Sequence, residues 1–404
     1  MKRSGARFPE GNLRGGPEKS FPMIETVSGA TTPATPLAAL LTSAAKAPEN
    51  QTFQVDSHPL GIYRGVLTPL ELDAPEQETA ALATGAAVHD LGWLRRISVR
   101  GEDRFRWLSG MVTNTVNDLM PNSGAWNLVL NAQGRIQGDL TVWREGEDLE
   151  LEIAADQYDK LLAHLDRFII MDDVELVALS GETALGQTAV GVTGPDADAV
   201  LGRAGLPVLA DPPTSTRVEW NGMDLRIARG HGVLAAHYAL WVQTAGLSKL
   251  WKYLRTAGAV AVGSRSLEAF RIAEGIPLYG VDMVERDLPQ EAVQNESGQM
   301  RALHFSKGCY LGQEIVERIR SRGNVHKHLR QLELFGPVPA SGTELRLDGA
   351  VAGEIRSAAA LRLPEGSRVF ALAMVRGEAE VKAQGFAYSA GAETGTARIV
   401  AERS

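Results

Sequence analysis

The sequence predicts an α+β protein whose main body is followed by a small C-terminal β-barrel. The chain has 404 residues, enough for two or three domains at about 150 residues each. Strand-like and helix-like segments alternate up to about residue 270, which is typical of an α+β body. After residue 329 apolar residues alternate along short segments between turn residues, and this rhythm favours a small barrel.

The domain boundaries follow from shifts in composition. The first part of residues 1–50 is rich in Gly, Pro, Ser and Thr and has no sustained apolar pattern. We therefore expect a disordered or loosely docked extension with a short helical stretch near 36–41. Residues 51–328 are expected to form the body, with a proline-punctuated subdomain near 185–260. Residues 329–404 are expected to form the barrel.

Local patterns place several elements within the body. Residues 93–99 predict a strand, and a helix opens after residues 101–103 with Phe105, Leu108 and Val112 on one face. A hairpin is expected next, with strands over 128–130 and 136–143 and a turn at 131–134. A helix over 157–170 and a strand over 174–179 follow.

Composition limits the class of protein. A net charge of −8 argues weakly against a nucleic-acid partner, since such binding usually needs a basic surface. No apolar run approaches the roughly 18–20 residues that span a bilayer, so no membrane partner is expected. A single cysteine excludes an internal disulfide framework, fits a reducing compartment, and cannot supply four thiolates to an iron–sulfur cluster. We therefore expect a cytoplasmic protein in a bacterium or a mitochondrial matrix protein in a eukaryote.

The motif that contains this cysteine is the main candidate for function. Residues 307–314 have the sequence KGCYLGQE, with Cys309 between a lysine and a glutamine–glutamate pair. Nearby cationic groups such as Lys307 would favour the reactive thiolate. Gln313 and Glu314 offer groups that can hold a polar heterocycle by paired hydrogen bonds. Free cysteines are also common as inert core residues, so both interpretations stay open.

A basic segment follows the motif and contains few acidic residues. This local excess in an acidic protein suggests an anionic partner, such as a ligand with carboxylate groups or RNA phosphate. The alternative is a solvated amphipathic helix with an ion pair between Glu314 and Arg318 and a C-terminal cap at Gly323. His326 and His328 lack further metal-type ligands nearby in the sequence, so no metal site is predicted. The cations and histidines are Arg301, His304, Lys307, Arg318, Arg320, Arg322, His326, Lys327, His328 and Arg330.

The motif and four further segments resemble a known family. KGCYLGQE is similar to the signature of the YgfZ-type folate-binding proteins, relatives of the glycine cleavage system T protein, an aminomethyltransferase that uses tetrahydrofolate. Residues 270–280 (FRIAEGIPLYG) and 288–291 (LPQE) resemble further segments of these proteins, as do 105–114 (FRWLSGMVTN) and 128–140 (LVLNAQGRIQGDL). The resemblance implies a T-protein-like body beside a C-terminal barrel, with tetrahydrofolate between the domains.

The resemblance also implies roles for individual residues. Cys309 and Asp139 are the expected chemical groups, because a hairpin aspartate assists chemistry at the folate nitrogen in the T protein. A solvated aspartate at a strand end is the alternative for Asp139. The expected folate-binding residues are Asn131, Arg271, Tyr279, Lys307, Tyr310, Gln313 and Glu314.

Some residues depart from the T-protein pattern. Gly138 stands where that family commonly has a first aspartate, and residues 228–234 (ARGHGVL) lack the glutamate that holds the pterin. Ala154 or Ala155 replaces an asparagine. A conventional aminomethyltransferase site is therefore in question.

Three hypotheses follow. In the first, the protein binds tetrahydrofolate and supports assembly or repair of iron–sulfur enzymes, with indirect effects on tRNA modification and with Cys309 required. In the second, it is a folate-dependent aminomethyl or methyl transferase that uses Asp139. In the third, it binds RNA through its basic segment, although that segment lacks interleaved aromatic residues.

Overall fold

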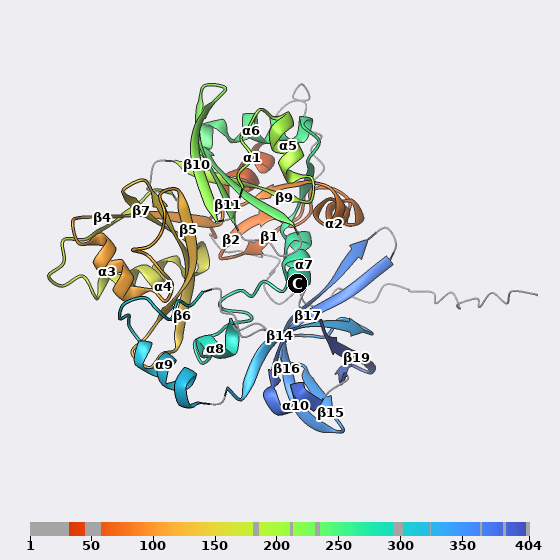
Figure 1. The fold of residues 1–404 in the computed structure, drawn as a ribbon. Helices are drawn as coiled ribbons and strands as arrows, with labels where there is room; N and C mark the ends of the chain where they lie inside the picture. Colours follow the sequence, from red (N-terminus) through yellow and green to blue (C-terminus); the bar gives the residue numbers. More distant parts are fainter. Residues whose placement is uncertain are drawn as a thin grey trace, which may run out of the picture.

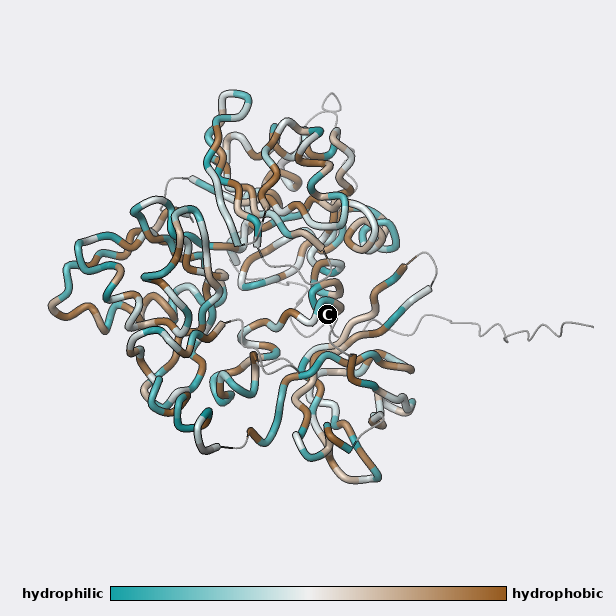
Figure 2. The backbone as a smooth tube through the Cα atoms, viewed as in Figure 1, coloured by the Kyte–Doolittle hydropathy of each residue, from teal (hydrophilic) through white to brown (hydrophobic). Residues whose placement is uncertain are grey.

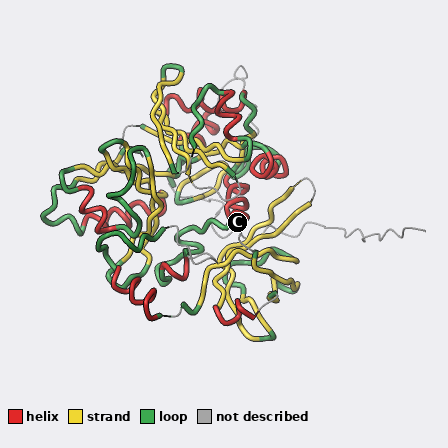
Figure 3. The backbone as a smooth tube through the Cα atoms, in the orientation of Figure 1, coloured by secondary structure: helices red, strands yellow, loops and turns green. Residues whose placement is uncertain are grey.

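The computed structural model describes residues 32–44, 58–180, 186–210, 213–230, 235–293, 302–323, 325–363, 366–382 and 385–400. In this part of the chain, three lobes surround helix α7 (Ser264–Glu274), as Figure 1 shows. Strands lie inside all three lobes and most helices lie on their outer sides (Figure 3). The expected α+β class with a C-terminal barrel is confirmed.

The first lobe carries the hairpin that the sequence predicted. Its strands lie in the order β5-β6-β7-β4-β8, and the Asn131 carbonyl accepts a hydrogen bond from the Gly134 N–H at the hairpin turn. Trp107 and Leu108 of α3 pack with Val129 and Val142 beneath this sheet. The lobe contains β4 (Leu94–Arg100), α3 (Arg104–Met111), β5 (Ser123–Leu130), β6 (Ile136–Glu145), β7 (Asp148–Ala154), α4 (Ala155–Asp166) and β8 (Glu175–Ala178).

The second lobe continues the same sheet in the order β13-β3-β9-β12-β11-β10. Its link to the first lobe is narrow, since β10 pairs with β5 only at Thr214 and Ser123. Helix α1 docks here through buried Leu37 and Ala38. The lobe contains α1 (Pro36–Ala44), α2 (Pro75–Thr84), β3 (Ala87–Asp90), β9 (Gln187–Gly194), α5 (Ala197–Arg203), β10 (Thr214–Trp220), β11 (Met223–Gly230), β12 (Ala236–Gln243), η1 (Thr244–Gly246), α6 (Leu247–Thr256) and β13 (Val260–Val262).

The third lobe is a closed barrel with the strand order β14-β17-β16-β15-β18-β19. Leu332, Ile355, Ala371 and Phe386 lie in its interior. Closure leaves the sheet without free edges. The lobe contains β14 (Lys327–Phe335), β15 (Glu344–Leu347), β16 (Ala350–Leu363), β17 (Gly366–Arg376), α10 (Gly377–Lys382), β18 (Phe386–Ala390) and β19 (Glu393–Ile399).

One apolar core joins the three lobes. Leu128 of the hairpin, Phe270 of α7, Tyr310, Val316 and Leu372 of the barrel all belong to it. Figure 2 shows apolar strands inside the lobes and hydrophilic residues on the outer loops. Three connections complete the structure: the β1 (Leu60–Tyr63) and β2 (Val66–Pro69) ribbon, α8 (Pro289–Ala292) and α9 (Gln313–Arg322). No helix among the described residues is long and apolar enough to cross a lipid bilayer.

Several expected boundaries differ from the structure. The helix predicted over 157–170 ends at Asp166, and the Trp107 indole donates a hydrogen bond to the carbonyl of Phe168 in the turn beyond it. The first barrel strand begins at Lys327, within the predicted body. The predicted limit at residue 50 lies outside the described residues.

Candidate functional site

The segment that carries the cysteine motif is fastened to the end of α3 by Lys307. Its ammonium donates hydrogen bonds to the carbonyls of Ser109 (2.9 Å), Val112 (2.6 Å) and Asn114 (2.7 Å). Carbonyls at a helix C-terminus lack partners within the helix, and a cation there also complements the helix dipole. Burial lowers the pKa of Lys307 to about 8. Lys307 therefore acts here as a helix cap.

The second glycine of the motif allows this segment to lie against the hairpin turn. Gly312 has φ +83°, and a Cβ there would lie 2.6 Å from the carbonyl oxygen of Asn131. The Asn131 side chain accepts hydrogen bonds from the backbone N–H groups of Gln133 and Arg135, both at 3.0 Å. Asn131 thus organises the turn that Gly312 contacts.

Cys309 is exposed between two fixed neighbours. Lys307 is held by carbonyls at and just beyond the end of α3, and Tyr310 is buried in the central core. The Tyr310 N–H donates to the Gln313 side-chain oxygen at 3.3 Å, whereas Glu314 is exposed. The interpretation of Cys309 as a core residue is therefore wrong, because the fold presents its thiol to solvent.

Asp139 lies within β6, opposite Leu128 of β5, and not at a strand end. One carboxylate oxygen accepts from the Trp126 indole N–H at 2.9 Å. The other accepts from the Gln157 side-chain amide at 2.9 Å, and the Asp139 N–H donates back to that amide at 2.9 Å. Both carboxylate oxygens of Asp139 are therefore held by side-chain N–H donors.

Tyr279 belongs to the same group of polar side chains. Its hydroxyl accepts from the Lys160 ammonium at 2.8 Å, and its carbonyl accepts from Arg64 at 3.2 Å. Arg64 in turn forms an ion pair with Asp156 at 3.1 Å. We call this group the α4 polar cluster: Arg64, Asp139, Asp156, Gln157, Lys160 and Tyr279. It brings together two predicted site residues that are 140 positions apart.

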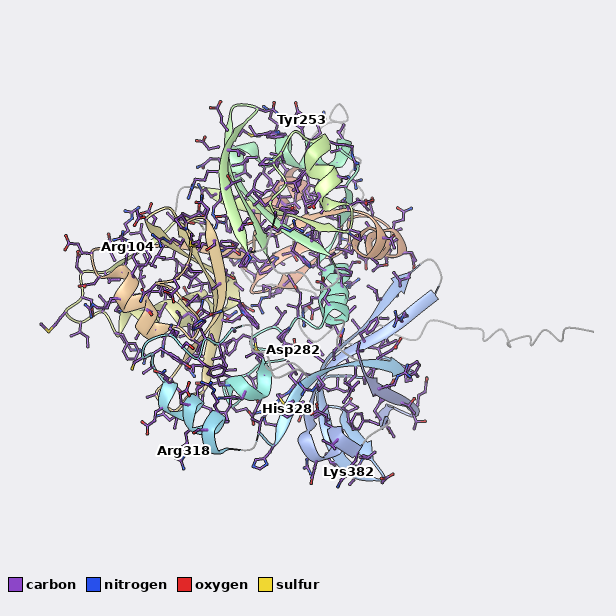
Figure 4. The ribbon with its side chains drawn as sticks, viewed as in Figure 1. Arg104, Tyr253, Asp282, Arg318, His328 and Lys382 are labelled. Atoms are coloured by element: carbon purple, nitrogen blue, oxygen red, sulfur yellow. The ribbon has the colours of Figure 1, made fainter. Side chains whose placement is uncertain are left out.

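Arg271 is held in a separate buried ion cluster. It donates to Glu268 through Nε at 2.8 Å and to Asp282 through Nη1 at 2.7 Å. Asp282 also accepts from Ser357 of the barrel at 2.5 Å, so this cluster connects α7 to the third lobe. Asp282 lies where the lobes meet (Figure 4). The carboxylates raise the pKa of Arg271 against the opposing effect of burial, and a ligand contact by this residue stays a prediction.

Part of the charge excess of the basic segment is cancelled by acidic residues distant in sequence. Lys327 pairs with Asp287 at 3.0 Å. His328 and Arg330 both contact Glu380 of α10, at 2.9 and 2.6 Å. An anion site formed by these cations is therefore not supported.

The helix of this segment also differs from its predicted charge pairing. Arg320 lies 3.4 Å from Glu317, in place of the expected pair between Glu314 and Arg318. Gly323 ends the helix, and its N–H donates to the Ile319 carbonyl at 2.9 Å. Arg318 projects from the outer side of α9 (Figure 4). Arg301 and the side chain of Arg322 lie outside the described residues.

Four members of the α4 polar cluster did not emerge from the sequence. Asp156 and Gln157 stand in the first turn of α4, where acidic residues also complement the helix dipole. Arg64 occupies a turn at φ +52°, and Lys160 lies one helical turn after Asp156. Acidic residues at a helix start are common, so only the contacts that link these residues in space to Asp139 and Tyr279 identify them.

The three lobes and their closed barrel define a class of fold found in aminomethyltransferases. The glycine cleavage system aminomethyltransferase T from Bartonella henselae matches with a TM-score of 0.75 at 18% identity, covering 92% of this chain and 97% of that one. Residues 62–295 match the family model described as the GCVT N-terminal domain, and the chain belongs to this family.

Curated relatives carry transferase names. The chain is 25% identical to a putative chloroplastic transferase of Arabidopsis thaliana over 288 residues, which cover 70% of this chain and 64% of the plant protein. It is 26% identical to an aminomethyltransferase of Rubrobacter xylanophilus over 327 residues, covering 79% and 83% of the two chains. The resemblance to the T-protein-like family is therefore confirmed.

Proposed function

We propose that the protein binds tetrahydrofolate and takes part in transfer of a one-carbon unit of the aminomethyl type. The observation that carries this proposal is Asp139, whose carboxylate is held between Trp126 and Gln157 and is only half-buried. Each carboxylate oxygen keeps a further lone pair for a ligand N–H. Membership of the family supports the same function.

The residues of the α4 polar cluster fit a reduced pterin. Asp139 would accept a hydrogen bond from a ring nitrogen, and the Tyr279 hydroxyl with Lys160 would orient polar groups beside it. Arg64 is 2% exposed, and its Nε lacks a hydrogen-bond partner among the described residues, which leaves one buried donor for a ligand or water. Bound tetrahydrofolate would supply the nitrogen that carries the one-carbon unit. The side chains of the protein would position this nitrogen and carry protons beside it.

Calorimetric titration of tetrahydrofolate tests this proposal. The wild-type protein should bind with a Kd in the micromolar range, and Asp139→Asn should weaken binding about tenfold, equivalent to about 1.4 kcal/mol. Asp159→Asn is the matched control, since it removes an exposed carboxylate from α4. Absence of wild-type binding, or equal effects of both substitutions, would refute the proposal.

Cys309 favours a second candidate function, the support of iron–sulfur enzymes that the YgfZ-type motif implies, with indirect effects on tRNA modification. The supporting observation is an exposed thiol on a loop fixed by Lys307 and Tyr310. Such a thiol is accessible to a partner protein, with folate bound elsewhere on the same chain. The RNA hypothesis has less support, because Lys327 and Arg330 of the basic segment are paired with carboxylates.

The second candidate is tested in cells that lack the protein. Activity of an iron–sulfur enzyme should be restored by the wild-type chain and by Ser306→Ala, but not by Cys309→Ser. Ser306 is a matched control because it is an exposed neighbour in the same loop. Full rescue by Cys309→Ser would show that the thiol is not required for this function, and it would leave the folate proposal unaffected.

A further inference from the structure

A chain of polar side chains runs across one face of the sheet in the second lobe and ends at α7. Thr193 of β9 lies directly opposite His237 of β12, so both side chains project from the same face. His89 of β3 lies opposite Gly191, and its ring fills the space that a Cβ at Gly191 would need. The ring can therefore reach Thr193. Glu274, the last residue of α7, contacts the other end of the chain at His237.

Hydrogen-bond distances connect all four polar residues. His89 Nε2 lies 2.9 Å from the Thr193 hydroxyl oxygen, and that oxygen lies 3.1 Å from His237 Nδ1. His237 Nε2 lies 2.7 Å from a carboxylate oxygen of Glu274. The His237 side chain is 27% exposed, whereas the other three side chains are buried. Because the Thr193 hydroxyl is buried, it cannot attack a substrate as the hydroxyl of a catalytic triad does, and the chain can only move protons.

One unpaired atom sets the direction of these hydrogen bonds. His89 Nδ1 is buried and has no hydrogen-bond partner among the described residues. A buried N–H without a partner is rarer than an unpaired acceptor, so the proton of neutral His89 belongs on Nε2, where it is donated to Thr193. The Thr193 hydroxyl then donates to His237 Nδ1, its other partner in the described part of the chain. His237 is therefore a neutral imidazole whose Nε2–H donates to Glu274.

Other charged groups near His237 do not change this direction. Arg229 of β11 lies opposite the residue after His237 and projects from the other face of the sheet, where it stacks over a tyrosine. Arg271 of α7 is held in its own buried ion cluster, and β9 contributes a neutral hydroxyl. Among the described residues, Glu274 and His89 are therefore the titratable groups that face His237. Burial lowers the pKa of His89 to about 3, so this ring stays neutral in the switch.

We propose that His89, Thr193 and His237 form a pH-dependent switch where the second lobe meets α7, in which protonation of His237 reverses the hydrogen-bond chain as far as His89. In the neutral state every link donates toward Glu274. One proton from solvent is added in total: His237 gains an N–H at Nδ1, the Thr193 hydroxyl turns to donate to His89 Nε2, and the His89 proton moves to Nδ1. The contact between His237 and Glu274 then becomes an ion pair of imidazolium and carboxylate. This inference is independent of the proposed function.

Nitrogen-15 NMR of the histidine rings shows which ring nitrogen carries the proton, and it provides the first test. At about pH 8, His89 and His237 should both be the tautomer with the proton on Nε2. Their signals are assigned with His89→Gln and His237→Gln. Thr193→Ser keeps the hydroxyl and should leave both tautomers in place. A proton on Nδ1 of either ring at this pH would overturn the inference.

The second test follows both rings as the pH is lowered. While His237 takes up its proton, His89 should exchange the Nε2–H tautomer for the Nδ1–H tautomer at the same midpoint and stay neutral. His326, which is exposed and lies outside the chain of hydrogen bonds, is the internal control and should titrate independently. Thr193→Val removes the hydroxyl and should let His237 titrate without a change at His89. If His89 of the wild type keeps its proton on Nε2, or His237 stays neutral until the protein unfolds, the inference fails.

Discussion

Replacing Lys307 by methionine tests whether this residue is a structural cap of α3. The substitution keeps a long apolar stem and removes the ammonium that contacts three carbonyls at 2.6–2.9 Å. Hydrogen bonds to charged groups contribute about 1.5–3 kcal/mol each, and water can reach part of the vacated space. We therefore expect Lys307→Met to lower the free energy of unfolding by about 3 kcal/mol.

Lys249→Met is the matched control. Lys249 is exposed and donates to one carbonyl, that of Asn221, at 2.8 Å. Loss of this hydrogen bond should lower the free energy of unfolding by about 0.5 kcal/mol or less. Urea unfolding followed by circular dichroism measures both variants, and amide hydrogen exchange should rise over residues 302–312 only in Lys307→Met. Equal losses in the two variants would refute the capping role.

Three further predictions concern the glycines, the buried side chains of His89 and Asp90, and the thiol. Gly312→Ala should cost about 3 kcal/mol or more in urea unfolding, because φ is +83° and its Cβ would meet a carbonyl at 2.6 Å. Gly308→Ala, which meets nothing within 4 Å, should cost under about 0.5 kcal/mol, and similar losses would contradict this explanation. Burial lowers the pKa of His89 to about 3, so its contribution to stability is lost as pH falls below its ordinary value of 6.5. Burial raises the pKa of Asp90 to about 6, so its contribution has the opposite sign, present below 3.8 and lost as pH rises through 6. His89→Asn should therefore gain stability relative to wild type between pH 6 and 4, by up to about 1.4 kcal/mol per pH unit, whereas parallel curves would exclude this linkage. Cys309→Ser should leave the unfolding free energy within about 0.5 kcal/mol of wild type and abolish labelling by a thiol reagent, and a large loss would mean that the residue packs inside the protein.

Local features of the fold could be predicted from the sequence. The hairpin turn over 131–134 and the start of α3 depend on neighbouring residues, and the structure has both. The barrel could be expected from alternation and turn residues alone. The end of α4 was harder to predict from the sequence, because the apolar residues beyond Asp166 continue a helical pattern. In the structure the turn there accepts a hydrogen bond from Trp107 instead.

The site was predicted less completely, since its contacts join distant parts of the chain. Lys307 could be identified as important, but its partners near α3 lie almost two hundred positions earlier. The basic segment looked uncompensated because Asp287 and Glu380 lie outside it. Asp156 carries no motif, and only folding places its carboxylate beside Asp139. Charge balance and the pairing of carboxylates depend on which residues the folded chain brings together.

The most direct test of the central claim is the response of the Trp126 indole to tetrahydrofolate. This N–H donates to Asp139, so its nitrogen-15 NMR signal reports on the proposed site. Trp220 is a matched internal control, because its indole donates to the Ala204 carbonyl in the second lobe. We predict that tetrahydrofolate shifts the Trp126 signal, assigned with Trp126→Phe, and leaves the Trp220 signal in place. Binding that leaves Trp126 unchanged would contradict the account.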